Sequence, residues 1–416
     1  MDEQAMRTAI ERKRDGESLG AETWHAIVAA YASGVVDDAQ MAALAMAVHF
    51  RELDLDEIVA LTEAMVESGE RLHFPREPFV VDKHSSGGVS DIVSLVAVPI
   101  VAACGVPVAK LSGRALGHTG GTIDKLEAIP GFRSALESGE FVAQVERIGC
   151  AIAAASEALA PADKRLYRLR DRTGSVPSVG LIVASILSKK IAGGAHGFVF
   201  DVKCGSAAFM HGENDALLLA RRLVEVAGRF GRPAHAIVSA MSEPLGRCIG
   251  TGIETIEARD FLRGARSDAR VHELVTVVAA KMLALGGVAD GARRAAAALA
   301  DGSAYERFVA MVEAQGATRG ALESLTIAPR SHEVRAALAG TVAEIDAVAL
   351  GNAARRLTQR HATAGIELLV RVGERVERGA PLATIYGEGA SAHEIQNAIA
   401  VTALPGAPPP LVLAQL

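Results

Sequence analysis

The sequence has few aromatic residues, and this scarcity limits both its core and its ligands. Aromatic side chains make up 4% of the 416 residues, although half of the residues are hydrophobic. A core built mainly from Ala, Val, Leu and Ile suits helices packed on a parallel or mixed sheet. Few rings are available to stack on bases, and the net charge of −6 argues against binding to phosphodiester chains. We therefore expect no nucleic-acid partner.

Cysteine is also scarce, and no long apolar run occurs. The four cysteines lie 44 to 54 residues apart, without the close pairs that zinc sites use: Cys104, Cys150, Cys204 and Cys248. This spacing predicts buried free thiols in a reducing cytoplasm. The apolar stretches are interrupted by Ser, Pro and Gly and are too short to span a bilayer. Because the first residues also form no apolar signal segment, we expect a cytoplasmic protein without a membrane partner.

Lysine is much rarer than arginine, and its distribution is uneven. Only nine of the 43 basic residues are lysines, and seven of these nine fall between positions 83 and 203. The seven are Lys83, Lys110, Lys125, Lys164, Lys189, Lys190 and Lys203. Lysine kept where the chain otherwise prefers arginine indicates a compact point charge, as phosphate binding requires. Some of these residues can still be ordinary surface or helix-end lysines.

Residues 82–127 contain one pattern twice. A β-like run, a loop rich in glycine and hydroxyl groups, and a helix-like run follow one another, and the two loops cover 83–88 and 110–121. Such a unit aims backbone N–H groups and the positive end of a helix at an anion. Neither GxGxxG nor GxxxxGK[ST] occurs, and Gly-Gly also marks simple tight turns. Because each loop also carries lysine, the pair predicts a phosphate site.

A histidine and a group of donors further along the chain are candidates for the remaining chemistry. His84 lies in the first loop, where an imidazole could donate a proton near neutral pH; His118 in the second loop is a weaker candidate. Ser185 and Lys189 are spaced i, i+4 on one predicted helix, and Arg170 precedes the turn before it. These donors suit a carbonyl-rich ligand such as a pyrimidine ring. Alternatively, Lys189 only offsets the dipole at the helix end.

The order of elements predicts an α/β fold in three parts. Helical periodicity over 1–70 predicts a helical lobe, in which Asp37 and Asp54 are placed to begin two helices. A helix–turn–helix at 161–193 could rejoin this lobe. Strand-like runs alternate with helices over 78–160 and 196–335, which predicts a larger α/β lobe with a central mixed sheet that binds phosphate. Short β-like runs over 336–416 predict a small C-terminal α+β domain.

Four motifs together resemble the thymidine phosphorylase and pyrimidine-nucleoside phosphorylase family. They are VDKHSSGGVSD (81–91), SGRALGHTGGTIDKLE (112–127), LAPADKRLYRLRD (159–171) and ASILSKKIAGGA (184–195). The second motif is highly specific, and the resemblance covers essentially the whole chain. It implies reversible phosphorolysis of pyrimidine (deoxy)nucleosides to free base and α-(deoxy)ribose 1-phosphate, with inorganic phosphate as co-substrate and no cofactor. It also implies a homodimer in which the helical lobe closes on the α/β lobe.

The resemblance assigns roles to individual residues. His84, Arg170 and Lys189 would be catalytic, with His84 protonating or hydrogen-bonding the leaving base. The phosphate donors would be Lys83, Ser85, Ser94, Lys110, Ser112 and Thr122. The base would be held by Arg170, Ser185 and Lys189 and walled by Leu116, Val176, Ile182 and Phe209. A potassium ion, as in some bacterial members, would bind near Ser90, Ile92, Leu245, Cys248 and Glu257.

The chain departs from the family pattern beside the implied base site. Where members usually read RD-x-TATV-[DEN]-S-[IV]-P, this chain reads RDRTGSVPSVG over 170–180, and Pro177 and Gly180 would reshape the turn. A smaller departure lies at 205–208. Two alternatives therefore stay open. One is a nucleoside phosphorylase or phosphoribosyl-type transferase with altered base specificity, and the other is a non-catalytic nucleotide-binding homologue.

Overall fold

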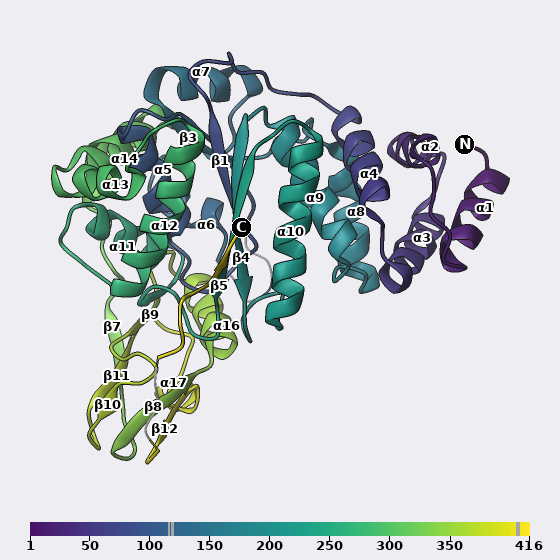
Figure 1. Cartoon of the computed structure of the whole chain (residues 1–416). Coiled ribbons are helices and arrows are strands. Elements are labelled where there is room, and N and C mark those ends of the chain that lie inside the picture. The colour runs from purple at the N-terminus through teal and green to yellow at the C-terminus, as the bar shows by residue number, and fades with distance from the viewer. Residues whose placement is uncertain (115–116, 118–119, 405–407) are drawn as a thin grey trace.

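The computed structural model describes residues 1–114, 117, 120–404 and 408–416. Two candidates from the sequence, Leu116 and His118, lie outside these residues. The described chain forms a helical lobe, a central sheet with helices on both faces, and a small domain of antiparallel strands (Figure 1). This arrangement confirms the predicted α/β fold class with its helical lobe and its small C-terminal α+β part.

The helical lobe begins with four helices at the N-terminus. They are α1 (Glu3–Arg14), α2 (Ala21–Ala32), α3 (Asp38–Arg51) and α4 (Leu55–Glu67). Asp37 and Asp54 begin α3 and α4 as capping boxes, in which each carboxylate accepts the backbone N–H of the third helical residue. Two later helices, α8 (Pro161–Thr173) and α9 (Val179–Ala192), pack against α2, α3 and α4, so the chain returns to this lobe (Figure 1).

The central sheet is mixed. Within the described ranges it contains six strands in the order β13-β5-β4-β1-β2-β3, of which the first five in sequence are parallel and β13 is antiparallel. The strands are β1 (Val81–Ser85), β2 (Val108–Ser112), β3 (Cys150–Ala154), β4 (Gly197–Cys204), β5 (Ala234–Ala240) and β13 (Val412–Gln415). Strand β13 comes from the end of the chain, which the sequence placed in the C-terminal domain, and it pairs with β5.

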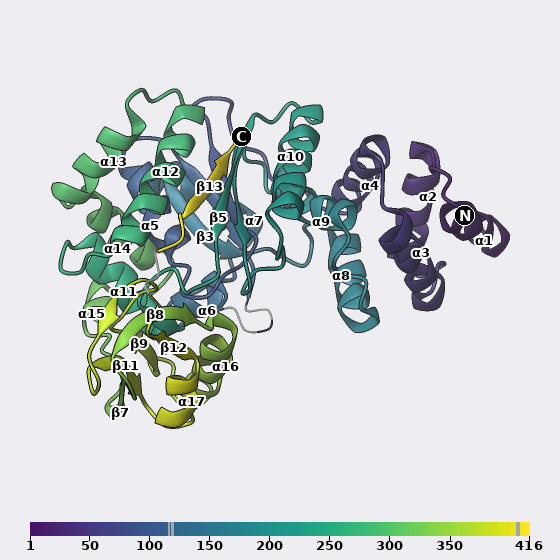
Figure 2. The same ribbon diagram turned by 60° about the horizontal axis from the view of Figure 1, so that its bottom comes forward.

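The two faces of the sheet carry two separate apolar cores, because successive side chains of a strand point to opposite faces. Val199 of β4 belongs to the core that contains α5 (Val93–Ala103), α11 (Gly252–Leu262), α12 (Ala269–Leu285), α13 (Gly291–Ala300) and α14 (Ser303–Ala314). Phe198 and Phe200 belong to the core that contains α7 (Ser138–Ile148), α9, α10 (Glu213–Arg229) and the helical lobe. Figure 2 shows α9 and α10 between the sheet and the outer helices. Helix α9 therefore lies at the junction of lobe and sheet.

The C-terminal part forms two small antiparallel sheets, of order β6-β9-β11-β7 and β10-β8-β12. Its elements are β7 (Arg330–Arg335), β8 (Gly340–Ile345), α16 (Ala347–Thr358), β9 (Gly365–Leu368), β10 (Arg375–Val376), β11 (Pro381–Tyr386), α17 (Ala392–Asn397) and β12 (Ile399–Thr402). Strand β6 (Cys248–Gly250) is supplied by the α/β part, and α15 (Arg319–Glu323) precedes β7. Over the described ranges, no helix has the length and apolar character that crossing a membrane requires.

Candidate active site

Strands β1 and β2 continue further than the sequence predicts. Lys83 and Ser85 lie in β1, and Lys110 and Ser112 lie in β2, although all four were expected in loops. The pairing explains the difference: residues 81–85 of β1 are in register with residues 197–201 of β4. A strand that is covered on both sides keeps its extended backbone even where the side chains are polar.

The first polar cluster surrounds Lys83 at the carboxyl end of the sheet. The Lys83 side chain is completely buried, and its Nζ lies 3.4 Å from Ser94 Oγ on α5 and 3.2 Å from Asp201 Oδ2 on β4. Lys203 of β4 is equally buried, and its Nζ lies 2.8 Å from the same Asp201 oxygen. Ser239 Oγ donates to the other Asp201 oxygen at 2.6 Å. One carboxylate therefore holds two lysines at this edge of the sheet.

Asp91 joins the β1–α5 segment to this cluster. Ser85 Oγ donates to Asp91 Oδ2 at 2.7 Å, and Lys203 Nζ lies 3.6 Å from the same atom. The charges of Lys203, Lys83 and Lys125 outweigh burial and hold the pKa of Asp91 well below its usual range. The sequence alone assigned no role to Asp91 or Lys203, although Lys203 belongs to the uneven group of lysines.

The second polar cluster surrounds Lys110 on β2. Lys110 Nζ donates to the carbonyl of Leu111 at 3.2 Å and to Ser112 Oγ at 3.4 Å. Lys190 of α9 reaches the same place, where its Nζ lies 2.6 Å from Asp82 Oδ2 and 2.8 Å from the carbonyl of Leu111. Burial, and then the charge of Lys190, hold the pKa of Lys110 well below its usual range. Thr122 begins α6 (Thr122–Leu126) just beyond this cluster.

His84 lies on β1 between Lys83 and Ser85 and is partly exposed. Burial lowers the pKa of its imidazole well below the usual range, and four lysines lower it further: Lys190, Lys110, Lys83 and Lys189. The imidazole is therefore neutral at pH 7, with one N–H to donate. Helix α9 meets this edge of the sheet through Lys190, which contacts Asp82 of β1 and the carbonyl of Leu111 of β2. That these elements hold phosphate and base around His84 stays a prediction.

Ser185 and Lys189, two of the residues predicted to hold the base, lie on α9. Lys189 Nζ donates to Ser185 Oγ at 3.2 Å and forms an ion pair with Asp163 of α8. Asp163 is 1% exposed, so a buried carboxylate on α8 fixes Lys189 while the lysine side chain stays partly exposed. Val176 and Ile182 are half-buried and Phe209 is 44% exposed.

Arg170 lies against the turn that follows α8 rather than in the open. It is 1% exposed, and its guanidinium donates to three backbone carbonyls, those of Ser175 (3.3 Å), Val176 (2.6 Å) and Leu181 (3.1 Å). Burial lowers the pKa of Arg170 to about 10, and the nearby Asp163 carboxylate opposes this shift. In this arrangement Arg170 shapes the turn between α8 and α9, and its direct contact with a base stays a prediction.

The residues assigned to a potassium ion lie together, but internal donors already bond to most of their oxygen atoms. The Glu257 carboxylate accepts the backbone N–H groups of Arg247 (2.8 Å) and Cys248 (3.0 Å), and burial raises its pKa to about 7. Ser90 donates to the Cys248 carbonyl, and Arg371 donates to the Leu245 carbonyl at 2.8 Å. Ile92 precedes α5 and is buried. Because these oxygens already accept internal hydrogen bonds, their arrangement gives no separate support for an ion, and no step of the reaction proposed below depends on one.

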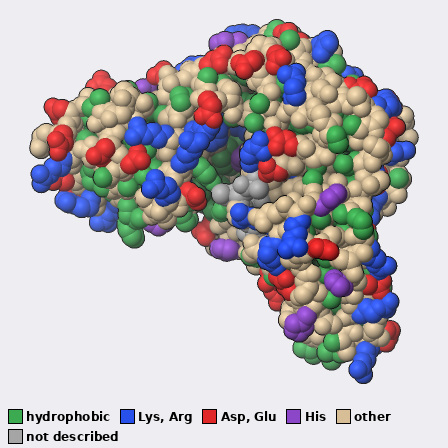
Figure 3. All heavy atoms as spheres, turned by 180° about the vertical axis from the view of Figure 1, so that it is seen from behind, with side chains coloured by type: hydrophobic (Ala, Val, Ile, Leu, Met, Phe, Trp, Pro, Cys, Tyr) green, Lys and Arg blue, Asp and Glu red, His purple; other side chains and the backbone are tan. Residues whose placement is uncertain are grey.

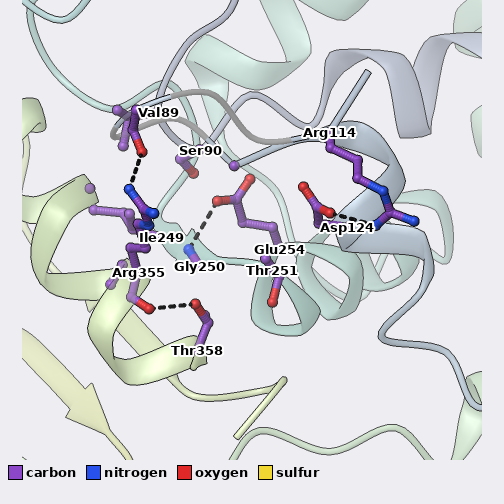
Figure 4. Close-up of a pocket in the computed structure, with 14 residues that line it drawn as sticks. Val89, Ser90, Arg114, Asp124, Ile249, Gly250, Thr251, Glu254, Arg355 and Thr358 are labelled. Carbon is purple, nitrogen blue, oxygen red and sulfur yellow. Dashed lines mark hydrogen bonds and ion pairs between the residues drawn. The ribbon is translucent and has the colours of Figure 1, made fainter. Parts of the chain in front are cut away.

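A cavity of about 350 Å³ lies beside these clusters, between α6, the β6–α11 turn and α16 (Figure 4). In its wall the Glu254 carboxylate accepts the Gly250 N–H at 2.9 Å and pairs with Lys125 at 2.6 Å. Ser90 is the one predicted site residue among the described residues that line the cavity. A separate hollow is visible in Figure 3 between the helical lobe and the rest of the molecule.

Comparison with known proteins agrees with this architecture. Three family models match in succession: the helical bundle domain of a glycosyl transferase family (residues 7–69), the a/b domain of that family (77–305) and a pyrimidine nucleoside phosphorylase C-terminal domain (341–403). The structure of anthranilate phosphoribosyltransferase from Thermus thermophilus has a TM-score of 0.61 at 21% identity, and the match covers 74% of this chain and 99% of that one. This likeness shows a shared fold.

Two relatives are similar over nearly their whole length. The chain is 42% identical to pyrimidine-nucleoside phosphorylase of Geobacillus stearothermophilus over 97% of its own length and 98% of the relative. It is 45% identical to thymidine phosphorylase of Mycobacterium tuberculosis over 91% of its length and 90% of the relative. Identity at this level, over nearly all of both chains, confirms the resemblance found in the four motifs. The chain belongs to the thymidine phosphorylase and pyrimidine-nucleoside phosphorylase family.

Proposed function

We propose that the protein catalyses the reversible phosphorolysis of pyrimidine (deoxy)nucleosides, which makes it a pentosyltransferase. The observation that supports this proposal is the contact of α9 with the sheet edge, where Lys190 reaches Asp82 of β1 and the carbonyl of Leu111 of β2. Two sets of predicted donors lie on the elements that meet there: Lys83, Ser85 and Lys110 on the sheet edge, and Ser185 and Lys189 on α9. The first set offers the point charges and hydroxyl groups that suit a phosphate ion. The second offers donors for the carbonyl groups of a pyrimidine.

The proposed step is a single displacement at C1′ of the sugar. A phosphate oxygen forms the new C–O bond while the bond from C1′ to the base nitrogen breaks, and its electron pair leaves with the base. The product is the α-(deoxy)ribose 1-phosphate with inverted configuration. Lys189 and Ser185 stabilise the negative charge that builds on the base, and the N–H of the neutral His84 imidazole hydrogen-bonds it. Protonation of the base by His84 would use the imidazolium form, which bound phosphate favours. The sheet edge holds phosphate in line for attack.

The other phosphate donors in the proposal are Ser94, which contacts Lys83, Ser112, which contacts Lys110, and Thr122 at the start of α6. Val176, Ile182 and Phe209 form the apolar part of the base pocket in this proposal, with Leu116 outside the described residues. Arg170 contributes through the turn that it holds. On the same family likeness we also propose three domains. They are the helical lobe (1–70 with 161–193), the α/β lobe (78–160 with 196–335) and the C-terminal α+β domain (336–416).

Phosphate binding should draw protons onto the protein. A phosphate dianion beside His84 and Lys110 favours their charged forms, and both groups start with lowered pKa values. Their pKa values therefore rise on binding, and near neutral pH the sign is proton uptake. Sulfate, a dianion that does not titrate near neutral pH, isolates the protein's share. Calorimetric titration with sulfate in two buffers of different ionisation enthalpy measures the number of protons that the protein takes up. We expect this number to be smaller in His84→Asn. Identical heats in both buffers would contradict the prediction.

A panel of nucleosides with inorganic phosphate tests the activity directly. We expect release of free thymine or uracil from thymidine or uridine, dependent on phosphate, and we measure it as free base. Activity on a non-pyrimidine nucleoside alone would favour the altered-specificity alternative, for which the 172–180 turn is the reason. Tight nucleoside binding without any turnover would instead indicate the non-catalytic homologue and contradict our proposal.

Three further features are proposals on the family likeness. We propose a homodimer, which fits the exposed apolar side chains of Val35 (65%) and Phe50 (76%) on the helical lobe, and light scattering of the purified protein would test it. We propose a cytoplasmic location, which fractionation of cells would test. The potassium ion stays a prediction that activity in potassium- and sodium-only buffers would test, since equal rates would argue against a role.

A further inference from the structure

Glu52 reaches from the corner between α3 and α4 to the start of α9. Its Oε1 accepts the backbone N–H of Val179 at 3.0 Å. Its Oε2 accepts the backbone N–H of Gly180 and the hydroxyl of Ser178, both at 3.1 Å. These are the first groups of α9, whose N–H donors have no partner within the helix. A carboxylate from another helix therefore caps α9, at the end where the helix dipole favours negative charge.

The backbone at Glu52 is strained. Its φ is 55°, in the left-handed region that residues with a side chain rarely adopt. Residues in this state persist where the surrounding structure fixes them. Here the Glu52 N–H donates to the Val48 carbonyl at 2.6 Å and ends α3, while the carboxylate is held by the three donors of α9.

Gly180 is matched to this corner. A Cβ at position 180 would lie 2.9 Å from Cβ of Leu53, the residue after Glu52, so a side chain there would push the corner away. Glycine also supplies the N–H that Glu52 accepts, which a proline at this position would lack. The glycine at position 180, which departs from the family pattern, is therefore in direct contact with the carboxylate of Glu52.

The capped segment controls the base side of the candidate site. Helix α9 carries Ser185 and Lys189 two and three turns beyond the cap. The turn before it supplies the carbonyls that hold Arg170, and Leu181, which follows Gly180, supplies one of them. A shift at the start of α9 would move all three groups relative to the sheet edge, where phosphate is proposed to bind.

We propose that Glu52 is a positioning residue for recognition of the pyrimidine base, acting through the cap of α9 in this chain. This inference rests on the proposed function. Glu52 contacts backbone and a serine hydroxyl, and its role is to set the place of Ser185, Lys189 and the Arg170 turn. Phosphate binding, which depends on β1 and β2, should not require it.

Steady-state kinetics of Glu52→Ala test this proposal. We expect the nucleoside KM to rise about tenfold. Nucleoside binding must then restore the start of α9, and loss of a helix cap disfavours the ordered helix start by on the order of that factor. The phosphate KM should stay within about twofold, and the ratio of kcat/KM for thymidine and uridine should change. Glu52→Gln keeps one acceptor oxygen, so its nucleoside KM should lie between those of wild type and Glu52→Ala. This variant also tests the proposal if Glu52→Ala does not fold.

Asp37→Ala is the matched control. Asp37 caps α3 through its own capping box with Gln40, and among the described residues it makes no hydrogen bond to the 172–180 turn, so Asp37→Ala should lower Tm without changing either KM. Gly180→Ala should raise the nucleoside KM with Glu52 intact, because its Cβ meets Leu53. If Glu52→Ala and Glu52→Gln lower Tm as the control does and leave nucleoside KM and base ratio unchanged, Glu52 is only a structural cap. A wild-type protein that turns over no nucleoside would instead remove the proposed function itself.

Discussion

Lys83→Met is expected to lower kcat/KM for phosphate at least a hundredfold, with a much smaller effect on nucleoside binding. Lys83 is the lysine at the centre of the sheet-edge cluster, and its ammonium group is completely buried beside Ser94. A preorganised donor in a site shielded from water contributes far more than the same charge in solution, and removing one such donor typically costs roughly 10²- to 10³-fold in rate. The measurement is initial rate against phosphate concentration at saturating nucleoside.

The fold should tolerate this change, because Asp201 keeps a second cation. Lys203 Nζ lies 2.8 Å from the Asp201 carboxylate and Ser239 donates to its other oxygen, so the carboxylate is not left buried without a partner. Lys281→Met on α12, outside the site, is the control for loss of one lysine. Near-normal phosphate kinetics in Lys83→Met would show that the cluster is structural.

Features that depend on neighbouring residues were visible in the sequence. Four of the unevenly placed lysines lie in the two polar clusters, Lys83 and Lys203 in the first and Lys110 and Lys190 in the second, and that these clusters bind phosphate stays a prediction. Periodicity located the helices of the lobe, and Asp37 and Asp54 cap the helices that they were predicted to begin. The prediction was wrong at the ends of β1 and β2, where polar residues were assigned to loops. Local sequence gives no information about the neighbouring strands that keep these residues extended.

Contacts between distant segments could not be predicted from one sequence. Glu52 and Ser178 are separated by 126 positions, and nothing near Glu52 indicates that its carboxylate caps a helix so far along the chain. Asp163 lies 26 positions before Lys189, and only the fold pairs the two side chains. The turn at 172–180 was visible in the sequence as a departure from the family pattern. Why position 180 holds glycine became clear only from the structure, in which Leu53 packs against Gly180.

Lys189→Met is the second change for which we expect a large effect, and here the nucleoside should be affected. Lys189 supplies the ammonium group that contacts Ser185 on α9, and a hydrogen bond to a charged group contributes about 1.5–3 kcal/mol. We therefore expect kcat/KM for thymidine or uridine to fall about 10- to 100-fold, while the phosphate KM stays unchanged. Initial rates against each substrate in turn separate the two.

Stability and activity can be separated at this residue by also changing Asp163. Lys189→Met leaves a carboxylate that is 1% exposed without its ion pair, and its Oδ1 already accepts no hydrogen bond from the described residues. This should cost about 1–3 kcal/mol of stability, reduced because Lys189 is itself partly exposed. Asp163→Asn in the same chain should restore Tm, because it removes the unpaired charge, but not kcat/KM. Recovery of both together would mean that Lys189 serves the fold and that the base is recognised by other residues.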